Sequence, residues 1–131
     1  MRRRIFLVAP LFAVPSVADI RQELTDLFAS MAAALSDANP DLFLRAIDPA
    51  LPNYGTFAEN VRALTSRNNV SSSIEVTAQE GDDAVQNVEL EWLLDVGGVR
   101  REAVVKCRLE RKKKQWRIVA LDPAGFFSPI V

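Results

Sequence analysis

The polar residues with the chemistry of a catalytic site lie between the second and third predicted helices. Asp48 and Tyr54 stand close together in the sequence, with Arg45 and Asn53 beside them. An acid beside a tyrosine could perform general acid–base catalysis on an enolisable carbonyl if burial raised the pKa of the acid. The alternative is structural, because Asp-Pro and Pro-Asn are common turn dipeptides. We therefore take Asp48 and Tyr54 as catalytic candidates, and Arg45, Asn53 and Tyr54 as candidates for the rim of a ligand pocket.

The composition excludes several classes of catalytic and cofactor chemistry. The chain of 131 residues has no histidine and one cysteine, Cys107. It therefore lacks the residues for a Ser-His-Asp triad, an HExxH zinc site, an intramolecular disulfide or a Cys-based metal cage. The five glycines fit neither a GxGxxG motif nor a Walker loop. A formal net charge of -1 gives no field that attracts nucleic acid. We expect no metal, no cofactor and no nucleic-acid partner.

Aromatic residues are the other candidates for contact with a ligand. Trp92 could stack on a small apolar ligand. Phe126 and Phe127 follow the last predicted strand, where they could cover the mouth of a pocket or contribute to a dimer surface. The inward positions of Trp92 and Trp116 on their strands favour core packing instead. Cys107 occupies an inward strand position between apolar neighbours, which predicts a buried and inert thiol.

The amino terminus has the pattern of a secretory signal peptide. Arginines at positions 2–4 precede an apolar run over residues 5–14, and small residues stand before a cut after Ala18. The run is too short to span a bilayer, which takes roughly 20 apolar residues. We interpret residues 1–18 as a signal peptide of the Sec or twin-arginine type, and residues 19–131 as one exported domain, periplasmic or extracellular, without a membrane anchor. The alternative is a cytoplasmic protein in which this run is a buried first segment.

Three helices are expected to position the candidate residues. Apolar residues recur at helical spacing over residues 20–35, with Asp19 as the expected N-cap. Asn39 caps a short second helix that begins with a proline. A third helix is expected over residues 56–65, with Thr56 at the start of a capping box.

From residue 70 onward the apolar period changes from 3.6 to 2, which predicts antiparallel strands. A two-residue hairpin at Gly97 and Gly98 places apolar residues on one face of the sheet and charged residues on the other, with Glu89 opposite Lys106. The expected apolar face consists of Val88, Leu90, Trp92, Ala103, Val105, Cys107, Leu109, Trp116 and Ile118.

A second hairpin follows, in a run of basic residues around position 113. Closing it places Leu109 beside Ile118 and Cys107 beside Ala120. The sheet acids, which are Glu75, Glu89, Glu91, Asp95, Glu102 and Glu110, then all face outward. Helices on one face of an antiparallel sheet make an α+β domain.

The order of elements and the closing motif resemble a known superfamily. Three helices precede long hairpinned strands that end in W-x-I-x-x-L-x-P, beginning at Trp116 and ending at Pro123. Over residues 19–128 this is similar to the nuclear transport factor 2-like superfamily, also called SnoaL-like or cystatin-like. The resemblance implies a cone-like fold in which helices and a curved sheet enclose a pocket. It implies no single function, because the family includes isomerases, dehydratases, cyclases, transport adaptors and uncharacterised exported proteins.

Three hypotheses about function remain open. The first is a non-catalytic exported domain that binds a small apolar ligand or a protein. It would form a homodimer through the outer sheet face, where Leu93, Val104, Val119 and Leu121 interrupt the charged residues. The second is a metal-free isomerase, dehydratase or cyclase that uses the acid and tyrosine named above. The third is an accessory domain of an envelope complex, with a collapsed pocket and a charged sheet face that docks a partner. Whether the interior is open or filled discriminates among them.

Overall fold

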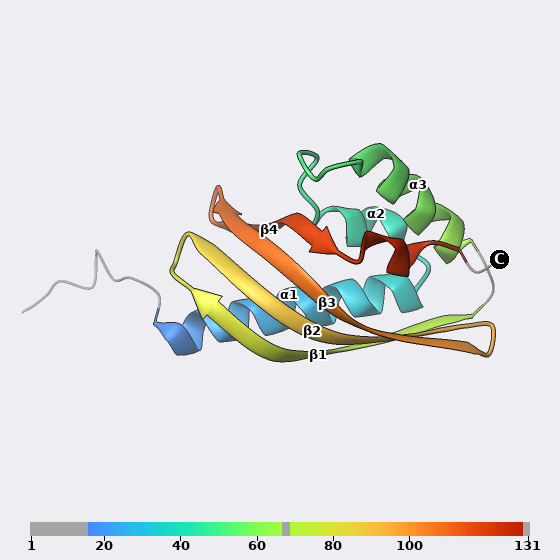
Figure 1. Cartoon of the computed structure of the whole chain (residues 1–131), viewed down its shortest axis with the longest axis horizontal. Coiled ribbons are helices and arrows are strands. Elements are labelled where there is room, and N and C mark those ends of the chain that lie inside the picture. Colours follow the sequence, from blue (N-terminus) through green and yellow to red (C-terminus); the bar gives the residue numbers. More distant parts are fainter. Residues whose placement is uncertain (1–15, 67–68, 130–131) are drawn as a thin grey trace, which may run out of the picture.

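A computed structural model describes residues 16–66 and 69–129, which fold into helices packed on a four-stranded sheet (Figure 1). The helices are α1 (Val17–Ser36), α2 (Pro40–Leu44) and α3 (Tyr54–Thr65). The strands are β1 (Val70–Gly81), β2 (Val85–Val96), β3 (Val99–Lys112) and β4 (Gln115–Asp122), followed by the 3-10 helix η2 (Ala124–Phe127). The basic and apolar parts of the expected signal peptide, residues 1–15, lie outside the described residues.

Helix α1 begins at Val17 because Ser16 caps it. The Ser16 Oγ accepts a hydrogen bond from the Asp19 N–H at 3.1 Å, and the Asp19 carboxylate accepts one from the Ser16 N–H at 3.3 Å. The expected N-cap at Asp19 is therefore wrong. Asp19 supplies the return contact of a capping box that Ser16 begins. A cut after Ala18 would remove this cap and the beginning of the helix.

The two short helices begin at asparagines. Asn39 caps α2 as predicted, since its side-chain oxygen accepts a hydrogen bond from the Leu42 N–H at 3.2 Å. Helix α3 begins at Tyr54, before the expected Thr56. Asn53 has a left-handed backbone conformation, with φ of 59°, that turns the chain directly into the helix.

The strands form one antiparallel sheet in the order β1-β2-β3-β4. The β2–β3 hairpin has the predicted register along its length, with Val96 opposite Val99. Gly97 and Gly98 both have positive φ, as a primed two-residue turn requires. Burial alternates along β2, so the predicted apolar set faces the helices and the sheet acids face outward.

The β3–β4 hairpin departs from the predicted register after Leu109, which lies opposite Ile118 as expected. Beyond that pair a β-bulge adds a residue to β4, and Cys107 lies opposite Leu121 instead of Ala120. The predicted cross-strand partner of Cys107 is therefore wrong. The bulge also turns Leu121 inward to pack against the core, so its expected position on the outer face is wrong as well.

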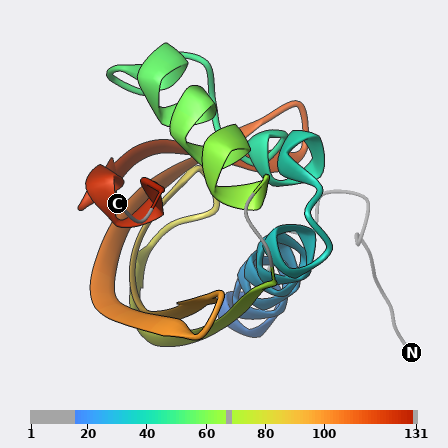
Figure 2. The same ribbon diagram turned by 90° about the vertical axis from the view of Figure 1, so that its right-hand side faces the viewer.

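Helices α1, α2 and α3 lie on one side of the sheet, which curls around them (Figure 2). The segment after α2 closes the β4 edge. The Asp48 N–H donates to the Ile118 carbonyl oxygen at 2.9 Å, and the Ile118 N–H donates to that of Ala46 at 2.8 Å. The protein is thus an α+β domain with helices packed on one face of a curved antiparallel sheet, as predicted. In the part of the chain described, no helix is long and apolar enough to cross a membrane.

Candidate functional site

An aromatic cluster fills the space between α2, α3 and the sheet. Phe127 of η2 contacts Phe43 of α2, Phe57 of α3 and Trp92 of β2, and Phe126 packs against Phe127. The Phe127 ring centroid lies 4.7 Å from that of Trp92 and 5.6 Å from that of Phe43, which are distances of packed aromatic pairs. Phe127 is fully buried. This part of the expected cone is therefore a core.

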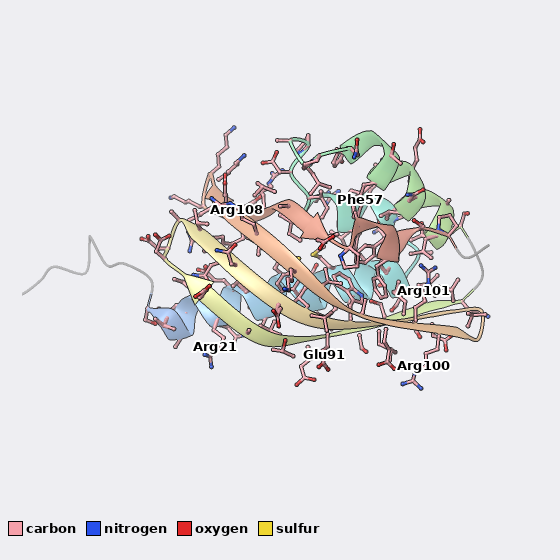
Figure 3. All side chains as sticks on the ribbon, in the orientation of Figure 1. Arg21, Phe57, Glu91, Arg100, Arg101 and Arg108 are labelled. Carbon is pink, nitrogen blue, oxygen red and sulfur yellow. The ribbon has the colours of Figure 1, made fainter. Side chains whose placement is uncertain are left out.

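Arg101 of β3 holds η2 against the sheet (Figure 3). Its Nη1 donates to the Phe126 carbonyl oxygen at 2.6 Å, and its Nη2 donates to the Ser128 carbonyl oxygen at 2.7 Å. Bonds from a charged guanidinium are stronger than those between neutral groups. This clasp explains why Phe126 and Phe127, which follow the last strand, lie inside the molecule and not across an open mouth.

The two tryptophans have polar contacts that fit a packing role. Trp92 is 1% exposed, and its Nε1 donates to the Ser72 Oγ at 2.8 Å. Trp116 is also buried, as its inward position predicts. Burial raises the pKa of the Cys107 thiol to about 12, so little thiolate forms at neutral pH. Cys107 is thus a buried thiol of low reactivity, as predicted.

Asp48 forms a charged link between the segment after α2 and the end of β3. Its Oδ2 accepts a hydrogen bond from Lys112 Nζ at 2.6 Å, and its Oδ1 accepts one from the Ala50 N–H at 2.8 Å. The bond from Lys112, followed by that from Ala50, holds the pKa of Asp48 below its ordinary value. A carboxylate stabilised in this way is a weak base at neutral pH.

The other candidates around Asp48 lie apart on the loop and the helix start. Tyr54 is half-buried as the first residue of α3 and packs against the core. Asn53 is exposed and lines a groove with Leu51 at the β4 side of the sheet. Arg45 is exposed at the end of α2. The contacts of Asp48 join it to Lys112 and Ala50, not to the tyrosine.

A cluster that the sequence did not indicate joins α1 to the β3–β4 hairpin. The Glu23 carboxylate accepts hydrogen bonds from Trp116 Nε1 at 2.8 Å and from Arg111 Nη2 at 3.0 Å. The Arg111 guanidinium also stacks 4.3 Å from the centre of the Trp116 ring. The bond from Trp116, with that from Arg111, lowers the pKa of Glu23. The polar groups of these three side chains are hydrogen-bonded to one another, and the cluster therefore fixes α1 on the β3–β4 hairpin.

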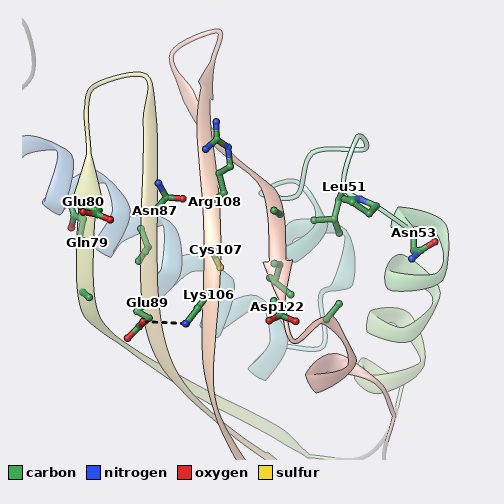
Figure 4. Close-up of a pocket in the computed structure, with 16 residues that line it drawn as sticks. Leu51, Asn53, Gln79, Glu80, Asn87, Glu89, Lys106, Cys107, Arg108 and Asp122 are labelled. Carbon is green, nitrogen blue, oxygen red and sulfur yellow. Dashed lines mark ion pairs between the residues drawn. The ribbon is translucent and has the colours of Figure 1, made fainter.

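The outer face of the sheet is charged and hollowed. A groove of about 820 Å³ runs across all the strands, with Glu89, Lys106 and Asp122 along it (Figure 4). Glu89 and Lys106 form an ion pair of 3.9 Å between neighbouring strands. In the described residues no cluster of His, Cys, Asp or Glu has the geometry to hold a metal ion. The face is suited to binding a charged surface.

The basic residues of this face all lie on one half of it, whereas acidic residues occur on both halves. The outward acids of β1 and β2 are Glu75, Glu80, Glu89, Glu91 and Asp95, and neither strand contains Lys or Arg. The outward bases are Arg100, Lys106 and Arg108 of β3 and Arg117 of β4. These two strands also carry the outward acids Glu102, Glu110 and Asp122, of which Glu102 and Glu110 form ion pairs with Arg100 and Arg108. Figure 3 shows Glu91 and Arg100 extending from the sheet away from α2 and α3.

Comparison with known proteins identifies the fold. No protein-family model matches the sequence, and no curated protein resembles it significantly. An NTF-2 like protein of unknown function from Shewanella oneidensis MR-1 has a similar structure, with a TM-score of 0.65 and 10% identity over 78% of this chain and 96% of that one. The chain has the nuclear transport factor 2-like fold.

Two further structures share the nuclear transport factor 2-like fold. One is a protein of unknown function with a cystatin-like fold from Nostoc punctiforme PCC 73102, with a TM-score of 0.59 and 13% identity over 85% of this chain and 96% of that one. The other is a proposed calcium/calmodulin dependent protein kinase II association domain from Xanthomonas campestris, with a TM-score of 0.64 and 17% identity over 83% of this chain and 89% of that one. At these identities the likeness concerns the fold alone.

Proposed function

We propose that this chain is an exported, non-catalytic binding domain that pairs with a second copy through the outer face of its sheet. The observation that carries the proposal is the uneven distribution of charge on that face: β1 and β2 carry acids and no base, whereas every Lys and Arg of the sheet lies on β3 and β4, together with three further acids. The aromatic cluster inside the domain supports binding at the surface over binding in a deep pocket.

Two-fold symmetry can bring the acids of β2 onto bases of β3. An axis parallel to the strands, passing between β2 and β3, lays β2 of one copy over β3 of the other. Because Glu89 pairs with Lys106 and Asp95 with Arg100 in the sheet register, each acid then faces the same base of the second copy. Such charge pairs steer association and fix its register.

Two apolar side chains give the middle of this face a contact that excludes water. Val104 is 51% exposed, and Leu93 is half-buried on the neighbouring strand. Leu93 lies opposite Glu102, so it is the diagonal neighbour of Val104. Burying exposed apolar area contributes about 25 cal/mol per Å². An apolar centre with a charged rim is the usual anatomy of a protein interface.

The contacts of Asp48 support a role without catalysis. Both of its carboxylate oxygens accept hydrogen bonds within the fold. The aromatic cluster packs the space between α2, α3 and the sheet. One structure with the same fold is named as a proposed association domain, which agrees with a function in assembly.

Export is part of the same proposal and has a separate test. The basic and apolar residues before Ser16 support it. Amino-terminal sequencing of the protein recovered from its native host should give a chain that starts at Asp19. A chain that retains Met1 would contradict export through a cleaved signal.

Analytical ultracentrifugation tests the pairing. The wild-type protein is expected to sediment as a dimer at micromolar concentration, with an affinity that falls as salt is added. Lys106→Glu should favour the monomer, because it places like charges across the axis. Combining it with Glu89→Lys should restore the dimer, since the two charges exchange places.

Lys113→Glu is the matched control, because it makes the same charge change at the β3–β4 turn, away from the face. It should leave the dimer intact. Circular dichroism verifies that each variant folds. A monomeric wild-type protein would overturn the homodimer and favour the accessory domain that docks another chain.

A further inference from the structure

Strand β1 is an edge of the sheet, and within residues 16–66 and 69–129 no further strand pairs with its outer side. The opposite edge is closed, because Ile47 bridges to Ile118 of β4. On the β1 edge, the Ser36 Oγ at the end of α1 accepts a hydrogen bond from the Ser72 N–H at 3.1 Å. That contact lies at one end of a long strand. Unpaired backbone groups along such an edge are a template for another strand.

The contact at Ser72 shows which backbone groups point outward. In an antiparallel pair, successive residues direct their N–H and C=O groups alternately toward the partner strand and away from it. Since the Ser72 N–H points away from β2, the backbone groups of Ile74 and Val76 do so too. A bulge between Val76 and Ala78 ends the run. The edge therefore presents the donors and acceptors of Ile74 and Val76.

A groove of about 770 Å³ lies between this edge and α1. Its helical wall has the small residues Ala29, Ala32 and Ala33, and the side chains of Ile74 and Val76 contribute from the strand. Small residues on the wall leave room for the side chains of an added strand. The part of the groove beside Ile74 and Val76 is thus lined by small and apolar side chains, while Arg21 and Thr25 of α1 line another part of it.

The outer side of the same edge carries two adjacent carboxylates. Glu75 lies directly opposite Glu91 in the β1–β2 register. Like charges in this position are unfavourable, and neither residue forms an ion pair within the described part of the chain. A positive side chain next to Glu75 would relieve the repulsion.

A second copy of this chain is a poor occupant of the edge. Antiparallel pairing of two β1 strands through Ile74 and Val76 would set Glu75 directly against Glu75 of the other copy. That contact would place like charges on the already acidic row. The charge of the edge instead favours a basic partner.

We propose that the β1 edge binds an extended segment of a partner protein as an added strand, with Lys or Arg facing Glu75 and an apolar side chain on either side of it. The backbone of the segment pairs with Ile74 and Val76, and its apolar side chains enter the groove over the α1 alanines. This surface is distinct from the proposed dimer axis.

Fluorescence anisotropy with two end-blocked, labelled peptides tests the proposal on the full chain. The sequences are Thr-Val-Lys-Val-Thr and Thr-Val-Glu-Val-Thr. The lysine peptide should bind about fivefold more tightly, as expected for reversal of one or two cross-strand charge contacts. Glu75→Lys should reverse the order. Glu80→Lys, an acid of β1 beyond the bulge, is the matched control and should keep it.

Amide hydrogen exchange followed by NMR locates the binding. The lysine peptide should slow exchange at Ile74 and Val76. Equal affinities of the two peptides, or protection confined to other strands, would overturn the proposal. If the amides of Ile74 and Val76 became protected without peptide as the protein concentration rises, the edge would bind a second copy of this chain, and the proposal would be overturned. Sedimentation of the same samples separates this result from failure of the outer-face dimer.

Discussion

The ring of Phe127 packs edge-on against Trp92, with centroids 4.7 Å apart and ring planes at 79°. The two residues come from η2 and β2, so their contact joins the end of the chain to the middle of the sheet. Arg101 holds η2 in place from β3. The aromatic core of this domain is therefore completed by Phe127, close to the end of the described chain.

Phe127→Ala should convert this part of the core into a cavity. Replacing a fully buried phenylalanine by alanine removes about 3–5 kcal/mol from the free energy of unfolding. Because the walls are apolar, the cavity should stay dry and bind benzene or xenon. Urea denaturation measures the loss of stability, and ligand-induced chemical shifts measure the binding.

Val99→Ala is a suitable control, because Val99 is 52% exposed at the β2–β3 turn. It should change stability little and create no ligand site. If the wild-type protein bound benzene as well as Phe127→Ala does, the interior would already contain an open pocket, and the account of a filled cone would be wrong.

The ion pair between Asp48 and Lys112 predicts a pH-dependent contribution to stability. The pKa of Asp48 is lowered from its ordinary 3.8, chiefly by the bond from Lys112. The folded state therefore binds this proton less readily than the unfolded state. The stabilisation is present above pH 3.8 and is lost as the pH falls through the lower pKa of the folded state.

Asp48→Asn should abolish that contribution. Wild type should be the more stable protein at neutral pH, and the difference in free energy of unfolding should shrink below pH 3.8. Asp41→Asn, which breaks an exposed ion pair with Arg62, is the control and should have little effect. A difference between wild type and Asp48→Asn that stays constant from pH 7 to the acid limit would contradict this prediction.

The β2–β3 hairpin could be predicted from sequence because two independent signals agree there. Gly97 and Gly98 mark the turn, and the alternation of apolar and charged residues admits one register. The outward position of the sheet acids follows directly. Parity alone predicts the inner and outer faces as long as no residue is inserted into a strand.

The bulge in β4 and the side-chain contacts of the interior could not be predicted from the alternation of apolar and charged residues. No local signal marks the extra residue that moves Leu121 inward. Glu23 and Trp116 are separated by 93 positions, so their hydrogen bond depends on the docking of α1. The burial of Phe127 likewise depends on the Arg101 clasp. These features arise from tertiary packing, which periodicity does not encode.

The cap of α1 provides a prediction about its first turn. Ser16→Ala removes the oxygen that accepts from the Asp19 N–H and should lower the free energy of unfolding by about 1 kcal/mol. Thermal denaturation followed by circular dichroism measures the effect. Ser30→Ala, at an exposed position within the same helix, should instead be neutral or slightly stabilising. Equal effects of the two substitutions would show that the capping bond contributes nothing.

The β3–β4 turn should gain stability from better turn residues. Lys113 and Lys114 both have positive φ, of 52° and 68°, in a two-residue turn where Asn-Gly is strongly preferred. A left-handed backbone conformation is strained for lysine because of its Cβ atom, and it is not strained for glycine. The double substitution Lys113→Asn, Lys114→Gly should therefore raise the free energy of unfolding by about 0.5–1 kcal/mol. The midpoint of urea denaturation measures the gain.

The other hairpin supplies a control of opposite sign. Gly98 occupies the position in the β2–β3 turn that Lys114 occupies in the β3–β4 turn, with φ of 89°. Beyond its two chain neighbours no heavy atom lies within 4 Å of the place where its Cβ would be added, so backbone strain is the main cost of a side chain there. Gly98→Lys should lower the free energy of unfolding by about 1 kcal/mol. If both changes lowered stability, positive φ would not be the factor that limits these turns.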